Sequence, residues 1–222
     1  MSRRNPELSL TLQNVRQGAT VDGVEEMILE TDAGNIPAHF HEAADGDAAV
    51  VWVGGAGGGL DGPAGGLYPR LARELVSDGI ASLRLHYRRP NQLTGCVLDT
   101  LLGVSYLGTR GRPRVALVGH SFGGAVVISA GAVSEQVVAV APLSSQTYGT
   151  ELVDQISPRP ILLLHGADDE ILTDACSRDI YQRAREPKQI KIYPGCRHGL
   201  DACRDEVDRD LLAWLRTVLH VH

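Results

Sequence analysis

Arg114-Val-Ala-Leu-Val-Gly-His-Ser-Phe-Gly-Gly-Ala-Val-Val-Ile-Ser-Ala-Gly-Ala132 is the stretch of this sequence that decides the fold. Its first part, Val115–Val118, is a continuous apolar run, which is typical of a short strand buried on both faces. Its last part, Ala125–Ala132, predicts a helix of small residues that can pack closely on a sheet. Between them, Gly119-His120-Ser121-Phe122-Gly123 matches the pattern Gly-x-Ser-x-Gly.

The spacing of this pattern has a steric reason. A serine on a sharp turn from strand to helix projects its hydroxyl above the sheet, and side chains two positions before and after it would collide with the neighbouring backbone. Gly119 and Gly123 remove those side chains. In a chain with 25 glycines the pattern could also be a chance match around a helix-capping serine. The strand before it and the helix after it favour a reactive Ser121.

With that context, the segment resembles the nucleophile elbow of the α/β-hydrolase family. The family places an acidic residue and then a histidine later in the chain, in the order Ser, Asp or Glu, His. The sequence outside the elbow can therefore be tested for those two residues.

The rest of the chain alternates short strands and helices. This order predicts an α/β fold with a mostly parallel sheet and helices on both faces, as in an α/β hydrolase. Strands are expected at 48–53, 80–85, 115–118, 136–141, 161–164 and 189–193, with helices at 67–77, 92–108, 125–132 and 205–219. Residues 142–160 are too few for an inserted lid, so no large cap domain is expected.

The whole chain, residues 1–222, is expected to form one α/β-hydrolase domain. Residues 1–20 could form an N-terminal arm or an edge strand. Residues 24–31 and 36–41 flank Asp32-Ala33-Gly34-Asn35 and predict a β-hairpin. In its second strand, His39 and His41 alternate with apolar residues, which places them on a face exposed to solvent.

The candidate acid follows the strand at 161–164, in the run His165-Gly-Ala-Asp-Asp169. A carboxylate at the carboxyl end of a parallel strand lies where open α/β sheets hold their sites. The family resemblance, through its His-Gly-x-x-Asp run, implies that Asp169 is the acid. Asp168 is the competing residue, and Asp174 is a weaker candidate that could cap a helix. His165 is interpreted as structural.

The candidate base is His198, in Pro194-Gly-Cys-Arg-His-Gly199. This loop lies between the last predicted strand and the last predicted helix, where the family resemblance places its histidine. The chain has 8 histidines, but His198 alone combines this position with flanking glycines. Ser121, Asp169 and His198 thus follow the family order.

The glycine-rich run that begins at Gly54 follows the strand at 48–53. Gly57, Gly59 and Gly62 fit Gly-x-Gly-x-x-Gly, but the next strand ends at Leu85-His86 without an acidic residue for a ribose, which argues against a dinucleotide. The family resemblance implies instead that a backbone N–H of this loop joins that of Phe122 in an oxyanion hole. Ala56 is the donor by alignment, and Gly55 is the alternative.

Together these residues predict a serine hydrolase that cleaves a carboxylic ester or thioester through an acyl-enzyme. The compact layout looks most similar to dienelactone-hydrolase-like proteins and small serine esterases; true dienelactone hydrolases use cysteine, whereas this chain has Ser121. An acyltransferase with the same triad, or a non-catalytic protein that binds a small molecule, are the alternatives. Pocket walls are expected to include Leu60, Tyr68, Tyr87 and Tyr148.

The composition of the chain argues against several classes of partner and ligand. A net charge of −6 without a cluster of Lys and Arg argues against nucleic acid. No secretory signal and no run near the ~18 apolar residues of a membrane span is visible, so a cytoplasmic protein is expected. Cys96, Cys176, Cys196 and Cys203 match no common zinc pattern, so no metal and no cofactor is expected and the thiols are predicted to be reduced. The sequence does not determine the substrate or the oligomeric state.

Overall fold

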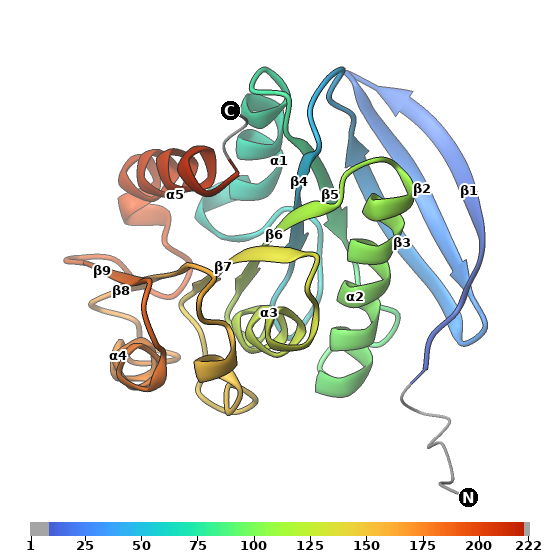
Figure 1. Ribbon diagram of the computed structural model, residues 1–222. Coiled ribbons are helices and arrows are strands. Elements are labelled where there is room, and N and C mark those ends of the chain that lie inside the picture. Colours follow the sequence, from blue (N-terminus) through green and yellow to red (C-terminus); the bar gives the residue numbers. More distant parts are fainter. Residues whose placement is uncertain (1–8, 220–222) are drawn as a thin grey trace, which may run out of the picture.

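The computed structural model describes residues 9–219 and is organised around one sheet of nine strands in the order β1-β2-β3-β5-β4-β6-β7-β8-β9 (Figure 1). Strands β4 to β9 are parallel to one another, whereas β1, β2 and β3 form an antiparallel extension that joins at β5. The strands are β1 (Leu12–Val21), β2 (Val24–Thr31), β3 (Gly34–His41), β4 (Ala48–Val53), β5 (Ala81–Leu85), β6 (Arg114–His120), β7 (Val137–Leu143), β8 (Ile161–Gly166) and β9 (Lys188–Tyr193).

Helices cover both faces of the parallel strands, as the alternating sequence pattern predicts (Figure 1). Helices α1 (Pro63–Val76) and α5 (Arg204–Val218) pack on one face, and α2 (Leu93–Thr109), α3 (Phe122–Val133) and α4 (Ala175–Arg183) pack on the other. Strand β4 is buried along its whole length because it faces both layers: Val51 points to the layer of α2 and α3, and Trp52 points to that of α1 and α5. No residue range was predicted for helix α4, but Asp174, named from the sequence as a possible helix cap, is its N-cap.

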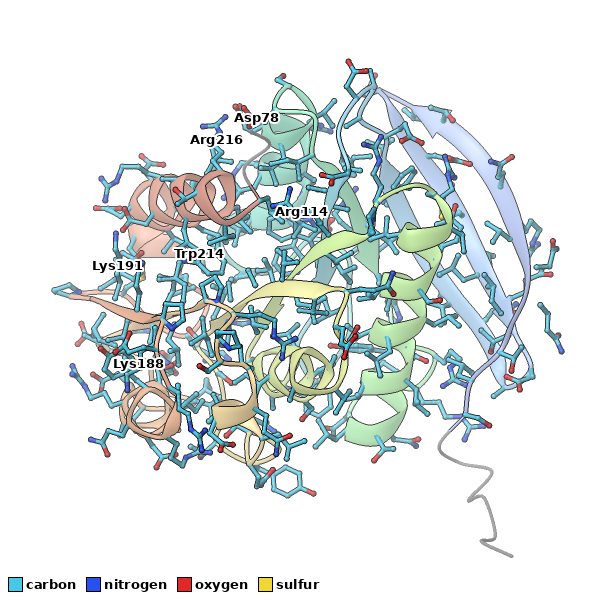
Figure 2. The ribbon with its side chains drawn as sticks, viewed as in Figure 1. Asp78, Arg114, Lys188, Lys191, Trp214 and Arg216 are labelled. Carbon is cyan, nitrogen blue, oxygen red and sulfur yellow. A yellow bond between two sulfur atoms is a disulfide. The ribbon has the colours of Figure 1, made fainter. Side chains whose placement is uncertain are left out.

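Helices α1 and α5 are tied to each other as well as to the sheet. Figure 2 shows Arg216 near the end of α5 beside Asp78, which follows α1, and their side chains form an ion pair with an N–O distance of 2.8 Å. Arg70 of α1 also bonds both carboxylate oxygens of Asp208 at 2.9 and 3.0 Å. Trp214 packs from α5 into the apolar layer under both helices. These contacts hold the last helix, and with it the loop that precedes it.

The connection between β7 and β8 is short. Between residues 144 and 160 it contains one 3₁₀ helix, η2 (Val153–Gln155). The prediction that no large cap domain covers the carboxyl ends of the strands is confirmed. Those ends lie at one edge of the sheet because the strands are parallel, and this edge holds the candidate site.

The antiparallel extension contains the predicted hairpin, β2 and β3, and an edge strand, β1. Residues 1–8, part of the predicted arm, lie outside the described residues. The expected exposure of His41 was wrong, and His39 is half-buried. His41 is 1% exposed, and Arg84 of β5 donates hydrogen bonds of 3.0 Å to His41 Nε2 and His39 Nδ1. Because β3 pairs with β5, this face of the hairpin lies beside Arg84 instead of facing solvent.

Within residues 9–219, none of the helices combines the length and the apolar character that crossing a membrane requires.

Candidate active site

Ser121 lies at the sharp turn between β6 and α3. Its backbone has φ of 59°, a strained value for a residue other than glycine, and its N–H donates to Leu143 O at 2.8 Å. The flanking glycines are required by contact. A Cβ on Gly119 would overlap the carbonyl oxygen of Gly123, and a Cβ on Gly123 would overlap the carbonyl oxygen of Gly54. The backbone therefore has the strained turn that the elbow pattern predicts.

The three residues singled out as nucleophile, acid and base lie together at the carboxyl edge of the sheet, although they come from the ends of β6, β8 and β9. His198 Nε2 is 3.0 Å from Ser121 Oγ, and His198 Nδ1 is 2.7 Å from Asp169 Oδ2. A carboxylate can only accept, so the proton of the neutral imidazole lies on Nδ1. This tautomer leaves the lone pair of Nε2 directed at the serine hydroxyl.

Asp169 is buried, whereas its competitor Asp168 is exposed. Burial by itself would raise the pKa of the Asp169 carboxyl, but hydrogen bonds from His198 and from the backbone N–H groups of Leu172 and Ile171 outweigh it and hold the pKa below its usual value. The two N–H groups reach Oδ1 at 2.8 and 2.9 Å. Asp169 is therefore ionised at neutral pH and fixed in direction.

His165, interpreted from the sequence as structural, contacts the same carboxylate. Its Nε2 lies 3.0 Å from Asp169 Oδ2 and 2.8 Å from Leu172 O, and its Nδ1 lies 2.7 Å from Ser177 Oγ. Because Leu172 O can only accept, Nε2 carries the proton and donates to it, and Asp169 Oδ2 lies beside this hydrogen bond. His165 thus links Leu172 to Ser177 and fixes the loop that holds Asp169.

His120, the residue before Ser121, contacts the candidate base, His198. Its ring centroid is 4.8 Å from that of His198, and its Nε2 lies 2.9 Å from His198 O. Burial lowers the pKa of His120 to about 4, so the ring is neutral at pH 7 and Nε2–H donates to that carbonyl. Sequence reasoning missed this contact because it joins two loops that are distant in the chain.

A disulfide encloses the loop of the candidate base. Cys196 and Cys203 are joined, with 5.8 Å between their Cα atoms, and His198 lies between them. The prediction of reduced thiols was wrong for this pair. Their separation of 7 residues matches no disulfide signature, so only the folded loop shows that the two sulfurs meet. Cys96 and Cys176 are free.

The candidate oxyanion donors come from two segments next to Ser121. Phe122 begins α3, so its N–H is one of the first-turn donors with no partner within the helix. The glycine-rich loop after β4 also approaches Ser121: a Cβ built on Gly55 would lie 3.5 Å from Ser121 Cβ. Ala56 is the next residue, and Gly58 N–H donates to Gly55 O at 2.9 Å, which fixes the peptide unit that carries the Ala56 N–H.

The four predicted pocket residues differ in their exposure to solvent. Tyr148 is 73% exposed, and Leu60 is half-buried with its carbonyl accepting from Arg84 at 3.2 Å. Tyr68 and Tyr87 are 0% and 1% exposed, so they present almost no surface to a substrate. Of the four, only Tyr148 and Leu60 are accessible as predicted for a pocket wall.

Comparison with known proteins identifies the family of this chain. Residues 67–218, more than half of the chain, match the dienelactone hydrolase family. The chain belongs to the dienelactone hydrolase family. This confirms the resemblance drawn from the elbow, the Asp169 run and the His198 loop, and it makes the chain an α/β hydrolase by family.

A curated relative matches over a short stretch. The uncharacterized protein YfhR of Escherichia coli K12 is 34% identical over 64 residues, which are 28% of this chain and 22% of that protein. The match thus spans about a fifth of the relative's length.

Solved structures resemble nearly the whole chain. Est1E from Butyrivibrio proteoclasticus has a TM-score of 0.74 at 17% identity, covering 86% of this chain and 98% of its own. A dienelactone hydrolase from Anabaena variabilis has a TM-score of 0.74 at 16% identity, covering 94% and 100%. The esterase domain of a Rhodothermus marinus protein has a TM-score of 0.71 at 20% identity, covering 89% and 99%. At these identities the likeness establishes the α/β-hydrolase fold.

Proposed function

We propose that this member of the dienelactone hydrolase family is a serine hydrolase that cleaves a carboxylic ester or thioester of a small substrate. The observation that carries the proposal is the continuous hydrogen-bonded chain from Ser121 Oγ through His198 to Asp169 Oδ2, with distances of 3.0 and 2.7 Å. A serine hydroxyl is a weak nucleophile until a base removes its proton, and this chain is the arrangement that activates it.

In the first half of the reaction, Ser121 Oγ attacks the carbonyl carbon while His198 Nε2 takes the hydroxyl proton. The C–O bond to Ser121 forms and the carbonyl oxygen becomes an oxyanion, which accepts hydrogen bonds from the N–H of Phe122 and from the Ala56 or Gly55 N–H. Asp169 stabilises the imidazolium without taking its proton. His198 then gives the proton to the leaving alcohol or thiol as the tetrahedral carbon collapses to the acyl-enzyme.

In the second half, water replaces the leaving group. His198 takes a proton from water, the hydroxide oxygen bonds to the acyl carbon, and the proton passes to Ser121 Oγ as the acid is released. The low pKa of Asp169 supports this cycle, because an ionised partner is required each time the imidazole becomes positive.

The size of the substrate is inferred from the open edge of the site. No large cap covers it, and Tyr148 and Leu60 are the accessible apolar groups among the predicted pocket residues. Structures with this fold include one in which ferulic acid is bound to Est1E. We therefore infer a small acyl group as the substrate class, in an enzyme formed by one domain.

The experiment that tests the proposal is intact-mass analysis after treatment with a fluorophosphonate, which needs no knowledge of the substrate. We expect one adduct on the wild type, no adduct on Ser121→Ala, and an adduct that forms at least about 10³ times more slowly on His198→Ala. Ser134→Ala, at the far end of α3, is the matched control and should label like the wild type.

An ester and thioester panel then follows with the same variants. Turnover that is lost in Ser121→Ala supports hydrolysis. Labelling of Ser121 with acyl transfer to an added alcohol or amine, but without net hydrolysis, would make the protein an acyltransferase. A folded wild type that neither labels nor turns over any ester would refute the proposal and favour a non-catalytic binding role.

A further inference from the structure

Two buried tyrosine hydroxyls donate to consecutive carbonyls of the loop that follows β4. Tyr68 of α1 donates to Val53 O at 2.8 Å, and Tyr87, which follows β5, donates to Gly54 O at 3.0 Å. Both side chains are 1% exposed or less. Burial raises the pKa of both phenols, so each remains a donor throughout the neutral range.

These two carbonyls lie against the elbow. A Cβ placed on Gly123 would lie 3.0 Å from Val53 O and would overlap Gly54 O. The carbonyls are thus packed between the first turn of α3 and the two phenols. A buried carbonyl in such a place needs a donor, and the tyrosines supply it from two separate elements.

The bond to Gly54 O determines where the next N–H points. In a trans peptide unit the C=O and N–H lie on opposite sides, so fixing Gly54 O fixes the N–H of Gly55, which pairs with Gly58 in an antiparallel bridge and so holds the turn that carries the Ala56 N–H. Gly55 is the residue of the loop that lies beside Ser121. The tyrosine bond therefore holds the loop peptides in one orientation relative to the nucleophile.

Tyr87 also contacts the other candidate donor segment. Its ring lies edge-on to the ring of Phe122, with 6.2 Å between centroids and an interplanar angle of 89°. Tyr87 thus contacts Phe122, whose N–H is one candidate oxyanion donor, and bonds Gly54 O in the loop that carries the other candidate donor.

From this geometry we infer that Tyr87, assisted by Tyr68, is a positioning residue of the oxyanion hole. The inference rests on the proposed hydrolase function. Tyr87 does not touch the substrate; its hydroxyl keeps the donors of the glycine-rich loop aimed at the place where the oxyanion forms. Since the oxyanion has full charge only near the transition state, misaimed donors lower kcat and leave substrate binding nearly unchanged.

Tyr87→Phe tests this inference because it removes the hydroxyl and keeps the ring that contacts Phe122. We expect kcat to fall about tenfold or more, with KM within about twofold, since losing a whole oxyanion donor costs about 10²–10³. The affinity for an aryl trifluoromethyl ketone, whose adduct with Ser121 carries the oxyanion, should fall by the same factor as kcat/KM. Tyr68→Phe should give a smaller loss of the same kind.

The control is Tyr106→Phe on α2, which removes another buried phenol. That phenol accepts a hydrogen bond of 2.8 Å from Arg110. It should lower the melting temperature without changing kcat. Wild-type kcat in a folded Tyr87→Phe protein, or a raised KM with unchanged kcat, would overturn the inference; if Tyr87→Phe does not fold, Tyr68→Phe decides by the same criteria. A wild type that fails to label or turn over would instead refute the proposed function itself.

Discussion

The parallel and the antiparallel parts of the sheet contain similar residues, but these residues have different roles. In the parallel part, β6, β8 and β9 all finish at one edge, so the residues that follow them meet, and Ser121, Asp169 and His198 form a hydrogen-bonded chain. In the antiparallel part, successive strands finish at opposite edges, so loop residues cannot gather in this way. Strand direction therefore decides where the candidate chemistry lies.

Histidine illustrates the difference. His198 lies in a loop, with one nitrogen on a carboxylate and the other on a hydroxyl. His41 lies within a strand of the antiparallel part, is 1% exposed, and accepts from Arg84. A carboxylate partner favours a protonated imidazole, whereas a buried arginine partner opposes it. The first arrangement suits proton transfer and the second suits packing, which predicts separable effects of substitution.

The largest effect is expected for Asp169→Asn in the parallel part. The amide cannot stabilise the imidazolium or hold Nδ1–H, and comparable changes in serine hydrolases cost about 10⁴ in kcat. The rate of inactivation by a fluorophosphonate measures this without a known substrate. The matched variant Asp168→Asn changes an exposed neighbour and should stay within a few-fold of the wild type. If Asp168→Asn proved the damaging change, the acid would be misassigned.

An intermediate effect is expected from the disulfide around His198. Cys196→Ser/Cys203→Ser opens a loop whose ends are 7 residues apart, and the lost constraint should lower the free energy of unfolding by about 2 kcal/mol. With the base less firmly held, kcat should fall several-fold. Urea unfolding and kinetics with and without a reducing agent measure both. Cys176→Ser, which removes a free thiol, is the control; equal behaviour of the two variants would mean that the disulfide does not support the loop.

The smallest effect on activity is expected for the antiparallel part, where His41→Gln should change stability alone. Burial, and then the charge of Arg84, lowers the pKa of His41 from 6.5 to about 4. In the unfolded state His41 therefore binds a proton below pH 6.5, whereas in the folded state it does so only below about pH 4. The free energy of unfolding therefore falls as the pH is lowered through this range.

Glutamine can still accept from Arg84 but does not titrate. Between pH 7 and pH 4.5 the wild type should lose more free energy of unfolding than His41→Gln, by on the order of 1 kcal/mol, with equal kcat at pH 7. Thermal or urea unfolding across that range measures the difference. Parallel pH profiles of the two proteins would show that His41 is not the titrating group.

Local patterns in the sequence were enough for the frame of the fold. The elbow around Ser121 could be predicted because strand, glycine spacing and helix are neighbours in the chain, and steric rules act over such short distances. The family resemblance implied the order Ser121, Asp169, His198, and each of these residues lies in a loop after a predicted strand. The extent of helix α4 was not predicted because its 9 residues are too few for a clear helical period, although Asp174 was named as a possible helix cap.

What the sequence by itself determined is the α/β frame and the elbow, which depend on periodicity and spacing along the chain, and, through the family resemblance, three candidate residues in their order. Only the tertiary structure decided which residues from distant parts of the chain contact one another. It shows that Asp169 is buried and Asp168 is exposed, and that Cys196 is bonded to Cys203. It also shows that the Tyr87 hydroxyl is buried and donates to Gly54 O, whereas a pocket wall was expected. Burial and long-range hydrogen bonds depend on how distant segments pack, and no local pattern encodes that packing.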